Sequence, residues 1–155
     1  MYRRPSYHFV QLTTENLATL LQQSIEQKNI LLNIYTSLLS EPQDEFITSM
    51  LSNLQATETK TKNRLEADYI AAYGATPNYA KGQADASFDS FLEGILLALR
   101  VNSQNIAFER EIMDQLGRER LGYDLYDYML RVDMSQQDLL NTLYVYYLHT
   151  YQLGI

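Results

Sequence analysis

Apolar residues recur every three or four positions along most of the chain, which is the spacing of one face of an α-helix. The stripe is clearest in the segment 17–39, where it consists of Leu17, Leu21, Ser24 or Ile25, Leu31 or Leu32, Tyr35, and Leu38 or Leu39. At the middle of this stripe stands Lys28, a charged residue at a core-facing position. The pattern therefore predicts a long helix whose buried face is interrupted once, by a lysine.

Proline and glycine mark the ends of the first two helices. The first helix is expected to begin at Thr13 or Thr14 and to end at about Ser40, because the residue before Pro42 is disfavoured in the α conformation. The second follows after a very short connection, so it should be antiparallel to the first, and Gly74 is its expected C-cap. Its stripe is apolar at both ends and polar in the middle, at Glu58 and Thr61.

The second half of the chain predicts two more long helices. The third helix opens near Ser87 and ends near Leu116, and Asn102 is the polar interruption of its stripe. After Gly117 and Gly122 we expect a short helical piece over residues 123–132, followed by a separate last helix over residues 135–152. Ser135 is the candidate N-cap of that last helix.

One long connection separates the second and third helices. Residues 75–87 contain Pro77 and Gly82 and show no period. Fully extended, this segment reaches about 43 Å, comparable with the roughly 40 Å of a helix of about 27 residues. A crossover along the whole height of a bundle is geometrically possible, so we predict an all-α four-helix domain over residues 13–155 preceded by an N-terminal arm, residues 1–12.

Composition narrows the classes of function. The formal charge of −7 and the scattered basic residues argue against nucleic acid as a partner. The chain has no Cys, which excludes disulfides and thiolate chemistry, and no apolar run long enough for a membrane span or a signal peptide. A cytoplasmic protein that binds neither nucleic acid nor membrane is the expectation.

The chain resembles the ferritin-like superfamily, specifically the small rubrerythrin-like proteins of spore-forming bacteria. SIEQKNILLNIYTSLL is similar to their AI-x-x-E-x-x-A-I-x-x-Y-x-x-L pattern, and ETKTKNRLEADYIAAYGATP to their D-E-x-x-H segment with its turn to proline. FLEGILLALRVNSQNIAF is similar to their third helix, whereas the fourth helix aligns loosely. The resemblance implies a ferritin-like bundle with a long crossover between helices 2 and 3, and with it a spore-associated location as a further option.

The same resemblance implies a dimetal site whose ligands are largely lost. Lys28 falls at a glutamate ligand, Thr61 at a histidine ligand and Asn102 at a carboxylate ligand, while Glu58 keeps the family glutamate. The last helix contains no E-x-x-H, and Leu139 and Thr142 are the expected occupants of its ligand positions. With both histidines of the chain near its ends, at His8 and His149, we expect neither a metal ion nor another cofactor.

We interpret Lys28, Glu58, Thr61 and Asn102 as a polar cluster at the vacated site. Lys28 and Glu58 would form a buried ion pair, with Asn102 and Thr61 bonding the remaining side-chain atoms. In the alternative, Lys28 extends out between the helices and Glu58 faces solvent. Catalysis by Lys28 as a Schiff-base amine, or by Glu58 as a general base, has the residue types but no supporting constellation.

Three functions remain open at this point. The first is a non-catalytic bundle with a structural or protein-interaction role, and the second is an oxidoreductase or ferroxidase that binds iron or manganese at a non-standard site. The second would need other acids, which we interpret as a solvated face: Glu93, Glu109, Glu111 and Asp138. The third is a subunit without a metal site of its own that pairs with a metal-competent ferritin-like relative. The expected assembly is a homodimer or a hetero-oligomer with a related ferritin-like protein, in which the tyrosine-rich segment 123–128 either contacts the partner or closes the end of its own bundle.

Overall fold

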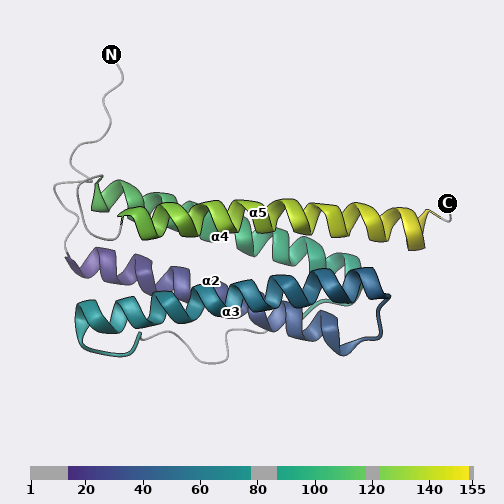
Figure 1. The fold of residues 1–155 in the computed structure, drawn as a ribbon, viewed down its shortest axis with the longest axis horizontal. Helices are drawn as coiled ribbons and strands as arrows, with labels where there is room; N and C mark the ends of the chain where they lie inside the picture. Colours follow the sequence, from purple (N-terminus) through teal and green to yellow (C-terminus); the bar gives the residue numbers. More distant parts are fainter. Residues whose placement is uncertain (1–13, 78–86, 118–122, 154–155) are drawn as a thin grey trace, which may run out of the picture.

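The computed structural model describes residues 14–77, 87–117 and 123–153, and these ranges are almost entirely helical (Figure 1). Their elements are the α-helices α2 (Thr14–Ser40), α3 (Glu45–Tyr73), α4 (Phe91–Leu116) and α5 (Tyr123–Tyr147), and the π-helical turn η1 (Leu148–Gln152). The described ranges contain no strand, which confirms the all-α, four-helix prediction. The expected arm, residues 1–12, lies outside the described residues.

Local side-chain chemistry explains where the helices begin and end. Asp44 caps α3 by accepting a hydrogen bond from the backbone N–H of Ile47 at 2.8 Å. Gly74 ends that helix in the left-handed conformation, with φ of 68°, as a C-cap glycine should. The third predicted helix begins a turn later than expected, at α4, because Ser90 and not Ser87 provides the N-cap, accepting from the N–H of Glu93.

The predicted break before the last helix is wrong. The helix α5 is continuous from Tyr123 to Tyr147, so Ser135 lies inside it and is not an N-cap. Neither Gly nor Pro occurs between its ends, and its buried positions keep the spacing of three and four residues throughout: Tyr126, Met129, Asp133, Gln136, Leu140 and Leu143. Two polar residues, Asp133 and Gln136, lie on this buried stripe and interrupt its apolar pattern, so the sequence suggests two helices where there is one.

The four helices pack side by side in a bundle. Figure 1 shows α2 and α5 running in one direction and α3 and α4 in the other. The antiparallel arrangement of α2 and α3, expected from their short connection, is therefore present. α2 packs extensively against α3 and α4, and α4 against α5, whereas α3 and α5 touch only lightly.

In the part of the chain that is described, no helix is long and apolar enough to cross a membrane.

The core consists of two apolar clusters with a polar layer between them. One cluster surrounds Leu31, Leu51, Ile95 and Leu140, and the other surrounds Ile25, Leu65, Ile112 and Met129. Every helix contributes to both clusters, and every helix also contributes to the layer between them. The buried polar residues are Ser24, Lys28, Glu58, Thr61, Asn102, Asn105, Glu109, Asp133 and Gln136.

Candidate functional site

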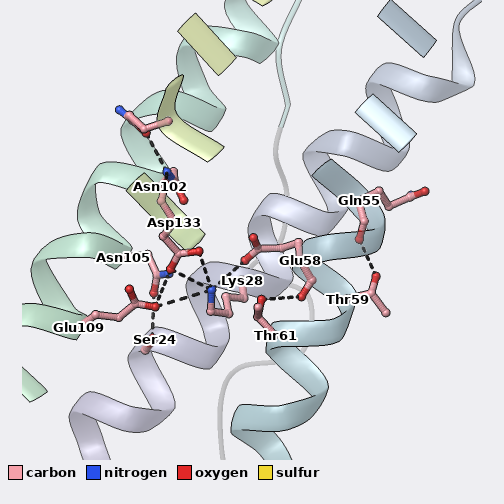
Figure 2. A network of polar contacts seen from close by, with 11 residues as sticks. Ser24, Lys28, Gln55, Glu58, Thr59, Thr61, Asn102, Asn105, Glu109 and Asp133 are labelled. Carbon is pink, nitrogen blue, oxygen red and sulfur yellow. Dashed lines mark hydrogen bonds and ion pairs between the residues drawn. The ribbon is translucent and has the colours of Figure 1, made fainter. Parts of the chain in front are cut away.

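The polar layer is centred on the ammonium group of Lys28 (Figure 2). Its Nζ lies 3.0 Å from both carboxylate oxygens of Asp133, 3.3 Å from Oε1 of Glu58 and 3.7 Å from Oε1 of Glu109. The lysine comes from α2 and the three acids from α5, α3 and α4, so the charged groups join all four helices. All four side chains are 0% exposed.

The expected contact between Lys28 and Glu58 is thus present, and the alternative in which Lys28 reaches solvent does not apply. The expectation named only one of the three acids around the ammonium, however. The interpretation of Glu109 as part of a solvated face is wrong, because its side chain is fully buried. The other acids of that set, Glu93, Glu111 and Asp138, are exposed as expected.

Asn105 connects the acids to the rest of the layer. Its amide nitrogen donates to Oδ2 of Asp133 at 2.8 Å and to Oε1 of Glu109 at 3.2 Å. Its amide oxygen accepts from the hydroxyl of Ser24 at 2.8 Å. A single amide therefore holds two carboxyl groups beside each other and attaches them to α2.

Thr61 and Asn102 are buried in the layer but do not bond the side chains expected for them. The hydroxyl of Thr61 donates to the backbone carbonyl of Glu58 at 3.2 Å, because a helical threonine easily reaches the carbonyl of the preceding turn. Asn102 donates to the backbone carbonyl of Asp133 and to Oε1 of Gln137, both at 2.8 Å. It therefore attaches α4 to α5 one turn away from the ammonium.

The last helix supplies Asp133 to the site and not the residues expected there. Leu139 packs against the apolar cluster around Leu31, and Thr142 is exposed and donates to the carbonyl of Asp138. Placing the start of the last helix at residue 135 excluded Asp133 from it. The signal that identifies Asp133 is its place in the three-and-four spacing between Met129 and Gln136.

The same three-and-four spacing identifies Asn105 and Glu109 of α4, which the prediction from sequence does not assign to the site. Its buried positions include Ala98, Asn102, Asn105, Glu109 and Ile112, which are again three or four residues apart. Following the apolar residues alone shifts the stripe to Ile106 and Met113, which are only half buried. Polar residues on a buried face are recognised by their spacing and not by their type.

Burial and charge act in opposite directions on the ionisation of this layer. Burial alone would lower the pKa of Lys28, but the charges of Glu58, Asp133 and Glu109 outweigh it and the pKa lies above its ordinary value. Burial raises the pKa of Glu58 to about 7 despite the opposing effect of Lys28. Burial also raises the pKa of Glu109 well above its ordinary value, and the neighbouring Asp133 raises it further.

The residues of this layer do not fit the dimetal centre that the resemblance implies. The three carboxyl groups converge on the ammonium of Lys28, which occupies the place that a shared cation would take. Among the described residues, no group of three or more His, Cys, Asp or Glu side chains is arranged to hold a metal ion. His149 is exposed on η1, and His8 lies outside the described residues.

The arrangement is also unsuited to the two catalytic roles considered for it. A Schiff-base lysine must release its proton to attack a carbonyl, whereas three acids hold the proton on Lys28. A general base must reach its substrate, whereas Glu58 is 0% exposed. In this closed form the layer can pair charges and hold the helices together.

No family model, curated protein or solved structure matches the chain. The contacts of its own side chains are accordingly the basis for a functional proposal.

Proposed function

We propose that this protein is a ferritin-like four-helix bundle in which a buried salt-bridge cluster replaces the dimetal centre, and that its role is structural or protein-binding and not catalytic. One observation carries the proposal. The Lys28 ammonium lies within 3.7 Å of one acid from each of the other three helices, in a layer closed to solvent. A charge from the protein itself then does what a metal would do in such a bundle, which is to connect the helices at mid-height.

The directions of the helices support the ferritin-like part of the proposal. α3 and α4 run the same way in Figure 1, so their connection has to join opposite ends of the bundle. The 17 residues between Tyr73 and Phe91 have a maximum reach of about 56 Å, against about 39 Å for the 26 residues of α4. The chain is long enough for the proposed crossover between the second and third helices of the bundle.

The outer surface supports a protein-binding role. Three large apolar side chains of α5, Tyr128, Met134 and Val145, are 46% to 53% exposed. Of the tyrosine-rich segment 123–128, Tyr126 is buried in the apolar cluster with Leu65 and Met129, whereas Tyr128 faces solvent. The segment therefore contributes to its own bundle and also leaves one aromatic ring for a partner, which we propose to be a second copy or a related ferritin-like subunit. Light scattering reports the assembly, and co-purification from the source organism reports its composition.

Metal analysis tests the central claim. Protein produced with added iron and manganese should contain far less than stoichiometric metal, because uptake requires removing Lys28 from its three acids. Stoichiometric iron or manganese in the wild-type protein would overturn the proposal and favour the oxidoreductase alternative. The variant Lys28→Glu exchanges the ammonium for a fourth carboxylate, and it should bind Mn²⁺ more tightly than wild type. The surface variant Lys62→Glu makes the same charge change away from the layer and is the matched control.

A further inference from the structure

The buried layer contains more acids than one ammonium can balance. If Glu58, Glu109 and Asp133 were all ionised, two of their three negative charges would have no compensating cation. The other ion pairs in the described ranges lie at the surface, between Lys62 and Glu66, Arg64 and Asp68, and Arg131 and Asp127. Uncompensated carboxylates are too costly to bury, so an imbalance of this kind is relieved by protonation.

The contacts rank the three acids by how well each is compensated. Asp133 receives the ammonium on both oxygens at 3.0 Å and the amide of Asn105 at 2.8 Å. Glu58 receives the ammonium on one oxygen at 3.3 Å. Glu109 has the longest contact to the ammonium, 3.7 Å, although its Oε1 also accepts from the amide of Asn105 at 3.2 Å. The Oε2 atoms of Glu58 and Glu109 are both buried without a hydrogen-bond partner. Glu109 is therefore the acid farthest from the one cation of the layer, and the one that the ammonium compensates least.

We propose that the layer is a proton-binding site, in which Glu109 carries a proton at neutral pH and shares it with the carboxylate of Asp133. Asn105 holds the two carboxyl groups beside each other, since its one amide nitrogen donates to Asp133 at 2.8 Å and to Glu109 at 3.2 Å. Protonation converts two repelling anions into a donor and an acceptor. It leaves Asp133 as the main counter-charge of Lys28.

The titratable groups around Glu109 come from the three helices that form the bundle with α4. Lys28 lies on α2, Glu58 on α3, and Asp133 and Tyr126 on α5, and Tyr35 of α2 lies near Glu58 and Asp133. Of these, Asp133 and Glu58 favour the protonated form of Glu109 and Lys28 opposes it, while burial remains the largest influence. Burial also raises the pKa of both tyrosines, so their phenols stay neutral and add no charge.

The proton makes the folded state dependent on pH in a definite direction. Because the pKa of Glu109 is higher in the folded protein than in the unfolded chain, the folded state binds an extra proton between the two values. Stability should therefore fall as pH rises through this window, by up to about tenfold in the folding equilibrium constant per pH unit for one proton. The pKa of Glu58 is also raised, to about 7, so its ionisation lowers the stability of the folded state as pH rises toward 7. The effect of Glu109 is therefore measured above pH 7.

The test compares Glu109→Gln with the wild type by chemical denaturation at several pH values above about 7. Glutamine has the shape of the neutral acid, so the variant should fold, match or exceed wild-type stability at neutral pH, and lose the wild-type decline above it. Glu111→Gln, an exposed acid on the same helix, should keep the wild-type decline. A variant that fails to fold, or that keeps the full decline, overturns the proposal.

Infrared spectroscopy gives a second readout that needs no unfolding. Folded wild-type protein at a pH above that at which Glu58 titrates should show the carbonyl band of a protonated carboxylic acid, and Glu109→Gln should remove it. Glu111→Gln should keep the band. Absence of the band from the wild type, or its persistence in Glu109→Gln, overturns the assignment of the proton to Glu109.

Discussion

Lys28 and Asp133 are 105 positions apart in the chain, and the ammonium of one lies 3.0 Å from both carboxylate oxygens of the other. This contact joins α2 to α5 at mid-height. Glu58 and Glu109 complete it from the two remaining helices. The bundle is therefore held at its centre by charge and at both ends by apolar packing.

Replacing the central cation should expose how much the fold depends on it. Lys28→Met leaves three buried acids without a counter-charge and should reduce the free energy of unfolding by roughly 3 to 5 kcal/mol at neutral pH. The loss should shrink as pH falls, since protonation neutralises the acids. Urea denaturation at neutral and acidic pH measures both effects. Lys60→Met, an exposed position on α3, should change stability little, and an equally small effect of Lys28→Met would contradict the central role of Lys28.

The ion pair of Lys28 and Glu58 should behave as one unit in a double-mutant cycle. Glu58→Leu removes one partner of the ammonium, and the double variant Lys28→Met with Glu58→Leu removes both. The double variant should be less destabilised than the sum of the single variants, because the second substitution removes a charge that the first left unpaired. Additive losses in urea denaturation would show that the two side chains do not interact.

A negative charge at position 105 should destabilise the folded protein. Asn105→Asp keeps the shape of the side chain but replaces the amide that donates to Asp133 and Glu109 with a further acid. We expect a loss of roughly 1 to 3 kcal/mol at neutral pH from the missing donors alone, and partial recovery at acidic pH. Thermal unfolding at the two pH values is the measurement. Gln104→Glu introduces an acid at the neighbouring exposed position and should leave the unfolding temperature nearly unchanged.

Asp44 should make one end of the bundle sensitive to acid. Its carboxylate caps α3 and accepts hydrogen bonds from the hydroxyls of Tyr146 and Tyr151. The bond from Ile47, followed by that from Tyr151, holds the pKa of Asp44 below its ordinary value. A lowered pKa in the folded state means that this stabilisation is present above about pH 4 and is lost as pH falls further.

Two substitutions separate the cap from the tyrosine contacts. Asp44→Ala removes both and should cost about 1 to 2 kcal/mol, whereas Asp44→Asn keeps a capping oxygen and should cost less. Both variants should show a weaker decline in stability below about pH 4 than the wild type. An unchanged acid decline in chemical denaturation of Asp44→Asn would rule out Asp44 as its source.

Gly94 should resist substitution although it lies inside a helix. A Cβ atom at this position would lie 2.8 Å from side-chain carbons of Leu38 and Phe88, closer than carbon atoms pack. Gly94→Ala gains up to about 1 kcal/mol of helix propensity but overpacks the contact, at a cost of about 1 to 3 kcal/mol. We expect a lower thermal unfolding temperature. A higher one would show that Leu38 and Phe88 move aside freely.

The all-α class and the extent of the first two helices could be predicted from the chain alone. Their stripes are long, and their ends carry local signals, such as Pro42 after Ser40 and Gly74 after Tyr73, that act within a few residues. The position of Lys28 on a buried face also followed from helix periodicity, whereas its contact with Glu58 was expected from the short connection between the first two helices together with the resemblance to ferritin-like bundles. The helix ends and the buried position of Lys28 depend on residues nearby in the sequence, so the sequence alone predicts them.

The composition of the buried layer depends on neighbours in space. The sequence places Glu109 among the surface acids and Asp133 between two predicted helical pieces. Both are buried beside Lys28 and Glu58, because an acid is stable in a core only when partners from other helices surround it. Asp133 also made α5 look like two helices, since a polar residue on an apolar stripe resembles the end of a helix. Periodicity selects the face on which each charge lies, but the packing of four helices determines that one ammonium meets three acids.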